Sequence, residues 1–153
     1  GLAAVMGHEV VHALARHGGE RMSQNTLAQT TLQAIGIALG VSGANPVVSQ
    51  GAMAALGVGA QVGVLLPFSR KHESEADYVG VLLAADAGYD PRESIQLWTR
   101  MGELSGGKSA SEFMSTHPSH ETRIEQLEEW MTEAMPIYQS KPPAPNHELP
   151  ALR

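Results

Sequence analysis

A long stretch without charge sets the main constraint on how this chain folds. Between Met22 and Ser69 there is no Asp, Glu, Lys or Arg, although the 153-residue chain carries 16 acidic and 10 basic side chains. Such a stretch is expected to pack against other apolar surface or against lipid. Its first part has apolar residues at helical spacing, which predicts a helix that ends in the turn region 40–46; these residues are Ala28, Leu32, Ile35 and Leu39.

Helical patterns cover most of the rest of the chain. Apolar spacing and turn residues predict helices over residues 2–20, 47–66, 69–87, about 91–104 and about 119–138. The first is expected to stop at Gly18 and Gly19, and the second at Pro67. No segment has a convincing strand pattern. The sequence therefore predicts a mainly α fold, with a core over residues 1–139 and an extended, proline-rich tail over 140–153.

Composition excludes several classes of partner and site. The net charge of −6 and the isoelectric point near 5.6 argue against a surface that follows nucleic-acid phosphates, so we predict no nucleic-acid partner. There is no cysteine, which excludes disulfides, a thiolate metal site and a cysteine nucleophile. Any metal site must therefore use histidine, aspartate or glutamate side chains.

The segment His8-Glu9-Val10-Val11-His12 has the spacing of a metal-binding motif. On a helix, residues i and i+4 project from one face, so His8 and His12 can offer two imidazole nitrogens to one ion. Glu9 then lies close enough to hydrogen-bond a metal-bound water without being a ligand itself. The alternative is a chance run of polar residues on an ordinary helix that binds no metal.

A catalytic zinc usually has three protein ligands, so one more is required. The best candidate is Glu73, because Asp77 follows at i+4 and can reach the far nitrogen of a ligand histidine and fix its tautomer. His72 is an alternative third ligand, but it would not place Asp77 one turn away on the same side. We therefore predict one zinc ion (Zn2+) per chain, held by His8, His12 and Glu73.

Four segments, in this order, resemble the HtpX, BepA and LoiP group of membrane-linked zinc metallopeptidases, and within it the branch that contains the mitochondrial overlapping-activity protease. They are HEVVHALARH (8–17), SRKHESEADYVG (69–80), AGYDPRES (87–94) and STHPSHETRIEQL (115–127). The resemblance covers nearly all of residues 1–135. It implies a helical gluzincin core preceded by a substrate-binding sheet. This chain has no room for that sheet, so we expect it to be incomplete at its N-terminus.

The same resemblance implies function and location. It implies His8, His12 and Glu73 as zinc ligands, Glu9 as general base, protein or peptide substrates, and a part in envelope or membrane protein quality control. The expected location is the bacterial cell envelope, in the periplasm and associated with the outer membrane.

Towards the C-terminus, the resemblance gives a role to His117. In the family, the histidine of this His-Pro motif lies near the metal, where it either occupies the open coordination position or helps to stabilise the oxyanion. Without the family, the Pro and Ser that follow make His117 an ordinary helix-entry residue. His120 and Arg123, one turn further on, either face the cleft or lie on a solvated helix face. His17 and His147 are interpreted as surface residues.

The predicted function is zinc-dependent endopeptidase activity. Glu9 takes a proton from zinc-bound water as that water attacks the scissile carbonyl, and passes it to the leaving amine. The alternative is a zinc-binding, non-proteolytic chaperone or assembly factor whose site is blocked by His117. A purely structural helical module is a third interpretation, and it predicts no zinc.

The predicted metal site limits what the uncharged stretch can do. Residues 47–66 are long enough to cross a bilayer. His12 and Glu73 must meet at one ion, however, which excludes an odd number of crossings between them. A second crossing would have to use residues 27–41, which are shorter and contain several polar side chains. We therefore expect a buried or cleft-covering helical pair that can also contact a membrane surface through residues 27–66, and a membrane-spanning hairpin is the alternative.

Overall fold

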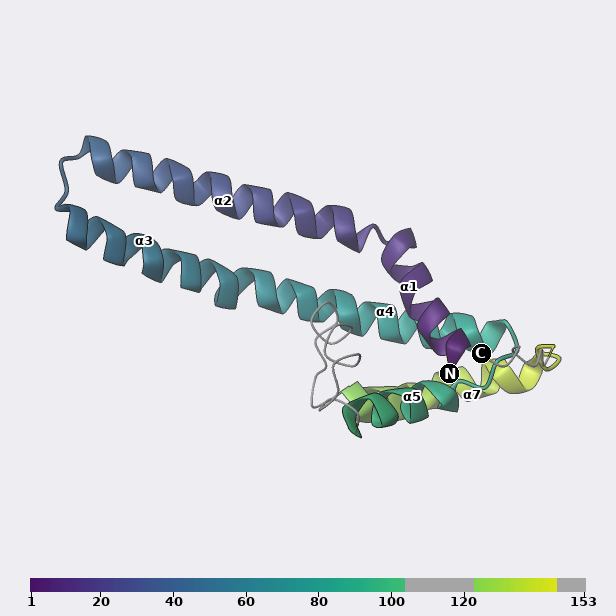
Figure 1. Ribbon diagram of the computed structural model, residues 1–153. Coiled ribbons are helices and arrows are strands. Elements are labelled where there is room, and N and C mark those ends of the chain that lie inside the picture. The colour runs from purple at the N-terminus through teal and green to yellow at the C-terminus, as the bar shows by residue number, and fades with distance from the viewer. Residues whose placement is uncertain (104–122, 146–153) are drawn as a thin grey trace, which may run out of the picture. The chain divides into compact units, whose positions relative to one another are not determined.

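The computed structural model describes residues 1–103 and 123–145, and over these residues the predicted mainly α fold is confirmed. None of the described residues forms a strand. The helices are labelled in Figure 1, except for the single π-helical stretch η1. Their bounds are α1 Leu2–Leu14, α2 His17–Val41, α3 Pro46–Ala60, η1 Gln61–Leu65, α4 Leu66–Asp86, α5 Arg92–Glu103 and α7 Arg123–Ser140.

The chain divides into two compact units. One contains residues 1–11 and 74–153, and the other contains residues 12–73. Both divisions fall inside helices, because α1 continues from Val11 to His12 and α4 continues from Glu73 to Ser74.

The first unit has its core where the second half of α4 meets α5 and α7. The core residues are buried apolar side chains from these three helices, namely Val81, Ala85, Trp98, Leu127 and Ala134. Half-buried residues of α7, among them Ile124 and Trp130, pack against them. At the end of this unit, the amide N–H of Ala144 donates to the carbonyl of Gly88 at 2.9 Å. The division into a core over 1–139 and a tail over 140–153 stays a prediction.

Helices α1 and α4 meet backbone to backbone at two glycines of the first unit. A Cβ atom added to Gly7 would lie 2.7 Å from the carbonyl oxygen of Gly80, and one added to Gly80 would lie 2.9 Å from the amide nitrogen of His8. Neither separation is sterically allowed for a real side chain. The two helices can therefore approach this closely only because both positions are glycine.

The second unit is dominated by a helical hairpin. Helices α2 and α3 run side by side in opposite directions (Figure 1). The predicted apolar stripe of α2 is half-buried in this pair, and a Cβ atom at Gly36 would meet the Met53 side chain at 3.7 Å. The hairpin turns through Asn45, whose side chain accepts a hydrogen bond from the Val47 amide at 2.9 Å and so caps α3.

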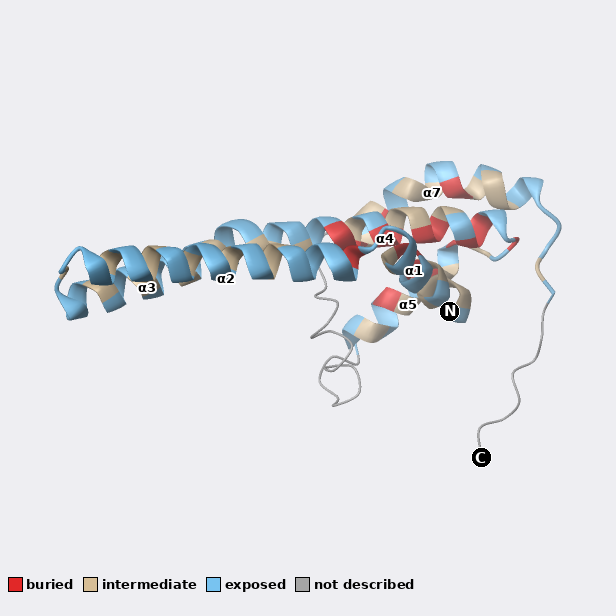
Figure 2. Cartoon of the chain, turned by 90° about the horizontal axis from the view of Figure 1, so that it is seen from above, coloured by how far each residue is buried: buried red, intermediate tan, exposed pale blue. Residues whose placement is uncertain are grey.

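The expected burial of the helical pair is wrong, whereas the alternative that the pair covers a cleft stays a prediction. Helix α3 has no buried residue, and large apolar side chains of the hairpin such as Ile37, Val41 and Val47 are exposed. Figure 2 shows α2 and α3 as almost wholly exposed or half-buried, whereas buried residues gather on α4 beyond the hairpin. Among the described residues, one helical stretch, Pro46–Asp86, is long and apolar enough to cross a membrane, and its most apolar part contains no fully buried residue. The hairpin therefore covers one stripe of apolar side chains and leaves the others uncovered.

Two predicted helix boundaries are also wrong. Helix α1 ends at Leu14, and Gly18 and Gly19 lie inside α2, because the break is made by Arg16 in the left-handed conformation (φ 57°, ψ 33°). A non-glycine residue pays about 1 kcal/mol for this conformation, and nothing in the residue type predicts it. Pro67 does not end its helix either. It follows the π-helical turn η1, which shifts the hydrogen-bond pattern just where proline can donate no N–H.

We predict that Gly80→Ala lowers the free energy of unfolding by about 1–3 kcal/mol, because the added methyl group forces α1 and α4 apart. Gly51→Ala is the matched control, since a Cβ atom at this position on α3 would meet nothing within 4 Å. It should raise the free energy of unfolding by about 0.5–1 kcal/mol through better helix propensity. Urea unfolding of both variants measures the difference. If Gly80→Ala and Gly51→Ala had the same free energy of unfolding, the close glycine contact between α1 and α4 would not be needed for stability.

Candidate metal centre

The first part of the site lies within the second unit. His12, near the end of α1, is half-buried, and its Nε2 atom lies 3.4 Å from Oε1 of Glu73 on α4. Glu73 is 4% exposed. Two ligands of a tetrahedral zinc ion, each about 2.1 Å from it, lie about 3.4 Å apart. The separation of these two atoms therefore fits two ligands of one zinc ion.

The second part of the site lies within the first unit. His8 is buried, and its Nδ1 atom is 2.8 Å from Oδ1 of Asp77, which is also buried. The Arg123 side chain donates from Nε to the other carboxylate oxygen of Asp77. The Arg123 guanidinium carbon lies 3.7 Å from the centre of the Trp98 ring, and that ring meets the His8 ring edge-on at 6.0 Å. His8 is thus held by a buried carboxylate, and that carboxylate is held by a buried cation.

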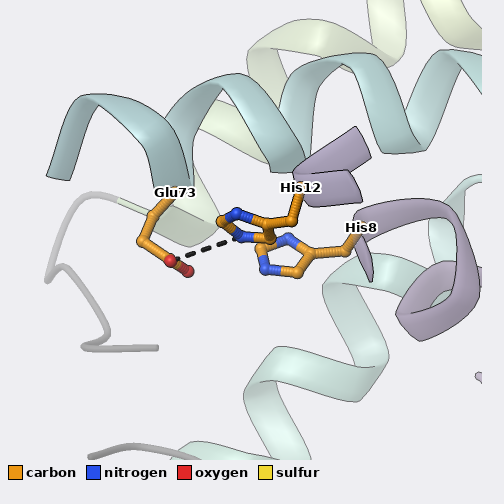
Figure 3. Close-up of side chains that lie close together, drawn as sticks. All are labelled: His8, His12 and Glu73. Carbon is orange, nitrogen blue, oxygen red and sulfur yellow. Dashed lines mark ion pairs between the residues drawn. The ribbon is translucent and has the colours of Figure 1, made fainter. Parts of the chain in front are cut away.

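The predicted ligands come together. His8 and His12 lie one turn apart on the same helix, and one ligand atom each from His8, His12 and Glu73 lie within 4.8 Å of one another. In Figure 3 the Glu73 carboxylate points toward the His12 imidazole, with the His8 ring beside it. Two imidazoles and one carboxylate are a donor set that suits a divalent ion such as zinc and leaves one position open. The residues present therefore fit the implied metal.

The other motif residues lie outside this ligand set. Glu9 is exposed on α1, directly after His8. His72, the alternative third ligand, has its Nε2 atom 3.1 Å from Oε2 of Glu20. Glu75 is exposed on α4. Among these residues only Glu9, through its place beside His8, has the position that the motif requires of a general base.

Sequence reasoning missed His17. The interpretation of His17 as a surface residue is wrong, because the residue is 4% exposed and its Nδ1 atom lies 3.0 Å from Nδ1 of His12. On one uninterrupted helix, a residue five positions after His12 would point about 140° away from it. The break at Arg16 brings the ring back toward His12, and only the unexpected third histidine of the run could have indicated this.

The remaining predicted residues divide into two groups. His117, His120 and His147 lie outside the described residues. Arg123 is described, and the alternative in which it lies on a solvated helix face is wrong, since it is 3% exposed and bonded to Asp77.

Known proteins resemble this chain over most of its length. The model of peptidase family M48 matches residues 1–131. The mitochondrial metalloendopeptidase OMA1 of Schizosaccharomyces pombe is 40% identical over 136 residues, which are 88% of this chain and 37% of that protein. The OMA1 protein of Saccharomyces cerevisiae is 33% identical over 144 residues, with 91% and 39% covered. A putative beta-barrel assembly-enhancing protease of Vibrio cholerae is 31% identical over 125 residues, with 80% and 26% covered.

The chain therefore spans about two-fifths or less of the length of these relatives. No solved structure matches it. The predicted location in a bacterial cell envelope is wrong, because relatives from two yeasts and a plant, each matching 88% or more of the chain, are named as mitochondrial proteins. Motifs of the catalytic core do not determine location, because the relatives that match this chain include both mitochondrial and bacterial proteins.

The predicted membership in a metallopeptidase family is confirmed, since the family model covers residues 1–131 with the ligand triad inside it, and the chain belongs to peptidase family M48.

Proposed function

We propose that this chain carries the zinc centre of a metalloendopeptidase, with one zinc ion held by His8, His12 and Glu73. The observation that carries the proposal is the convergence of these three side chains, two from α1 and one from α4. The same donor set also serves iron oxygenases. The glutamate that follows His8 and the membership in a peptidase family favour zinc and hydrolysis.

Bound zinc supplies Lewis-acid chemistry, because it lowers the pKa of water toward neutrality and polarises a carbonyl group. The protein does the proton transfer. In this proposal the Glu9 carboxylate accepts a proton from the attacking water and then donates it to the amine that leaves as the peptide C–N bond breaks. The products are one carboxylic acid and one amine, and Glu9 returns to its starting state.

Asp77 and Arg123 orient His8 for metal binding. The Nδ1–H of His8 donates to Asp77, which leaves the Nε2 lone pair for the metal. Arg123 pairs with the second oxygen of Asp77 and stacks on Trp98, so the carboxylate is fixed and its buried charge is compensated. Replacing Asp77 would therefore weaken metal binding without removing a ligand.

The names of the relatives support protein substrates. They are a mitochondrial metalloendopeptidase and a beta-barrel assembly-enhancing protease. We propose that this chain likewise acts on protein or peptide substrates, in the quality control of membrane proteins. The proposed catalytic core covers residues 1–139.

We predict that Glu9→Gln in the full-length protein retains about one zinc per chain and lowers casein cleavage by at least about 100-fold, because the amide cannot accept the proton. Wild-type cleavage should stop when a chelator removes the metal and return when zinc is added. Elemental analysis and release of labelled peptides measure the two properties.

Glu125→Gln is the control, because Glu125 is an exposed residue of α7 and its substitution makes the same isosteric change. This variant should cleave casein like the wild type. Undiminished cleavage by Glu9→Gln would contradict the assignment of the general base.

We also propose that the α2–α3 hairpin contacts a lipid bilayer within residues 27–66. Within this stretch neither helix carries a charge, and basic residues lie just beyond the uncharged stretch, at the start of α2 and of α4. These residues are Arg21, Arg70 and Lys71, and all three are exposed. Apolar helices flanked by basic side chains suit a membrane with anionic head groups.

Large apolar side chains are exposed at the tip of the hairpin. Around the turn, Ile37, Val41, Val47 and Val48 are each at least 67% exposed. The earlier part of α2 carries Gln and Thr side chains, which do not suit the centre of a bilayer. The tip is therefore the part expected to enter the lipid, while the polar part of α2 stays at the surface.

We predict that the full-length protein floats with liposomes that contain anionic lipid, and that Val47→Glu/Val48→Glu reduces this binding at least roughly tenfold. The two glutamates lie in the first turn of α3, where negative charge favours the helix, so folding should be preserved. Gln29→Glu/Gln33→Glu adds the same charge to the polar part of α2 at the membrane surface and should reduce binding much less than the tip variant does. Equal flotation of the wild type and the tip variant would contradict the proposal.

A further inference from the structure

We propose that His17 is a positioning residue that holds His12 in the tautomer and orientation needed for metal binding. The inference rests on the proposed zinc centre and concerns a residue outside its ligand set. It starts from one contact, the 3.0 Å separation between the Nδ1 atoms of His12 and His17. Both residues lie in the second unit of the chain.

The geometry of His12 fixes which atom carries its proton. The Nε2 atom faces Glu73 at 3.4 Å, so this is the nitrogen available to a metal. A neutral imidazole that binds metal through Nε2 carries its proton on Nδ1. The only hydrogen-bond direction that fits is then donation from His12 Nδ1–H to the lone pair of His17 Nδ1. His17 thus does for His12 what Asp77 does for His8.

The His17 ring is itself held in place. It stacks on the His72 ring, with ring centres 4.3 Å apart and planes 10° from parallel. His72 is in turn 3.1 Å from Glu20, one turn after the start of α2. Because His17 is 4% exposed and packed in this way, its acceptor atom is fixed before any metal binds.

The backbone supports the same conclusion. Arg16 has a left-handed conformation, and it ends α1 so that His17 becomes the first residue of α2. The Glu20 amide donates to the Arg16 carbonyl at 3.0 Å and secures the new helix directly after the break. Unusual backbone conformations are retained where the surrounding structure demands them, often at functional sites. Here the helix break at Arg16 brings His17 into contact with His12.

The test compares His17→Leu with His17→Asn in the full-length protein. The Asn side chain places an acceptor oxygen near the position of the histidine Nδ1 atom, whereas the leucine side chain has similar size and no acceptor. Zinc affinity is measured by competition with a chromophoric chelator. The proposal predicts that His17→Leu weakens zinc binding about 10–100-fold, and that His17→Asn stays within about threefold of the wild type.

A second readout reports the hydrogen bond directly. In the cobalt(II)-substituted protein, the exchangeable Nδ1 protons of metal-bound histidines give separately shifted proton NMR signals. The wild type and His17→Asn should show two slowly exchanging signals, one from His8 and one from His12. His17→Leu should lose the slow exchange of one signal only, because the bond from His8 to Asp77 is unchanged.

The outcomes separate this inference from the proposed function. If the wild type binds no zinc, both fail. If the wild type binds zinc and His17→Leu binds it equally well, the metal centre stands and the positioning role is overturned. Should His17→Leu fail to fold, as judged by circular dichroism, His17→Asn decides alone. Retention of both cobalt signals and of zinc affinity in that variant supports the role, and loss of either overturns it.

Discussion

The close crossing of α1 and α4 at Gly7 and Gly80 is the contact on which the candidate site depends. From this point the two helices pair in one register, in which later residues of α1 meet earlier residues of α4. His8 reaches Asp77, and one turn further on His12 reaches Glu73. A side chain at either glycine would separate the two backbones, and the His8–Asp77 pair of the same unit would lengthen. Two glycines without reactive side chains thus set the distance between His8 and its partner Asp77.

The polypeptide between the two ligands explains the fold of the second unit. This unit begins at His12 and ends at Glu73, so its two ends are a contacting pair of the candidate site. Bringing together two residues this far apart costs loop entropy. An antiparallel helical hairpin returns the chain to its starting point with regular hydrogen bonds in place of a long irregular loop. The hairpin therefore brings the two ends of the second unit, His12 and Glu73, together.

Much of this could be predicted from the sequence, because the decisive signals are local. The i, i+4 spacing of His8 and His12, and of Glu73 and Asp77, follows from helix geometry alone. The half-buried stripe of α2 also follows from apolar periodicity. The Glu73–Asp77 spacing also indicated a carboxylate that holds a ligand histidine but not which histidine, and in the structure Asp77 lies against His8.

The errors concern features that depend on context. The left-handed Arg16 depends on what surrounds the chain, so the helix break and the burial of His17 were missed. Pro67 usually ends a helix, but a π-helical turn accommodates it here. The burial predicted for the uncharged stretch was wrong, because composition alone cannot distinguish apolar side chains that this chain covers from apolar side chains that it leaves exposed.

The central claim is that Glu73 completes a zinc site with His8 and His12, and zinc content tests it most directly. Full-length wild type, Glu73→Gln and Glu75→Gln make the comparison, because both variants have the same isosteric change on α4 and only one alters the proposed ligand. The account predicts about one zinc per chain in the wild type and in Glu75→Gln, and loss of zinc in Glu73→Gln. Folded wild type without zinc, or a Glu73→Gln variant that keeps its zinc, would contradict it.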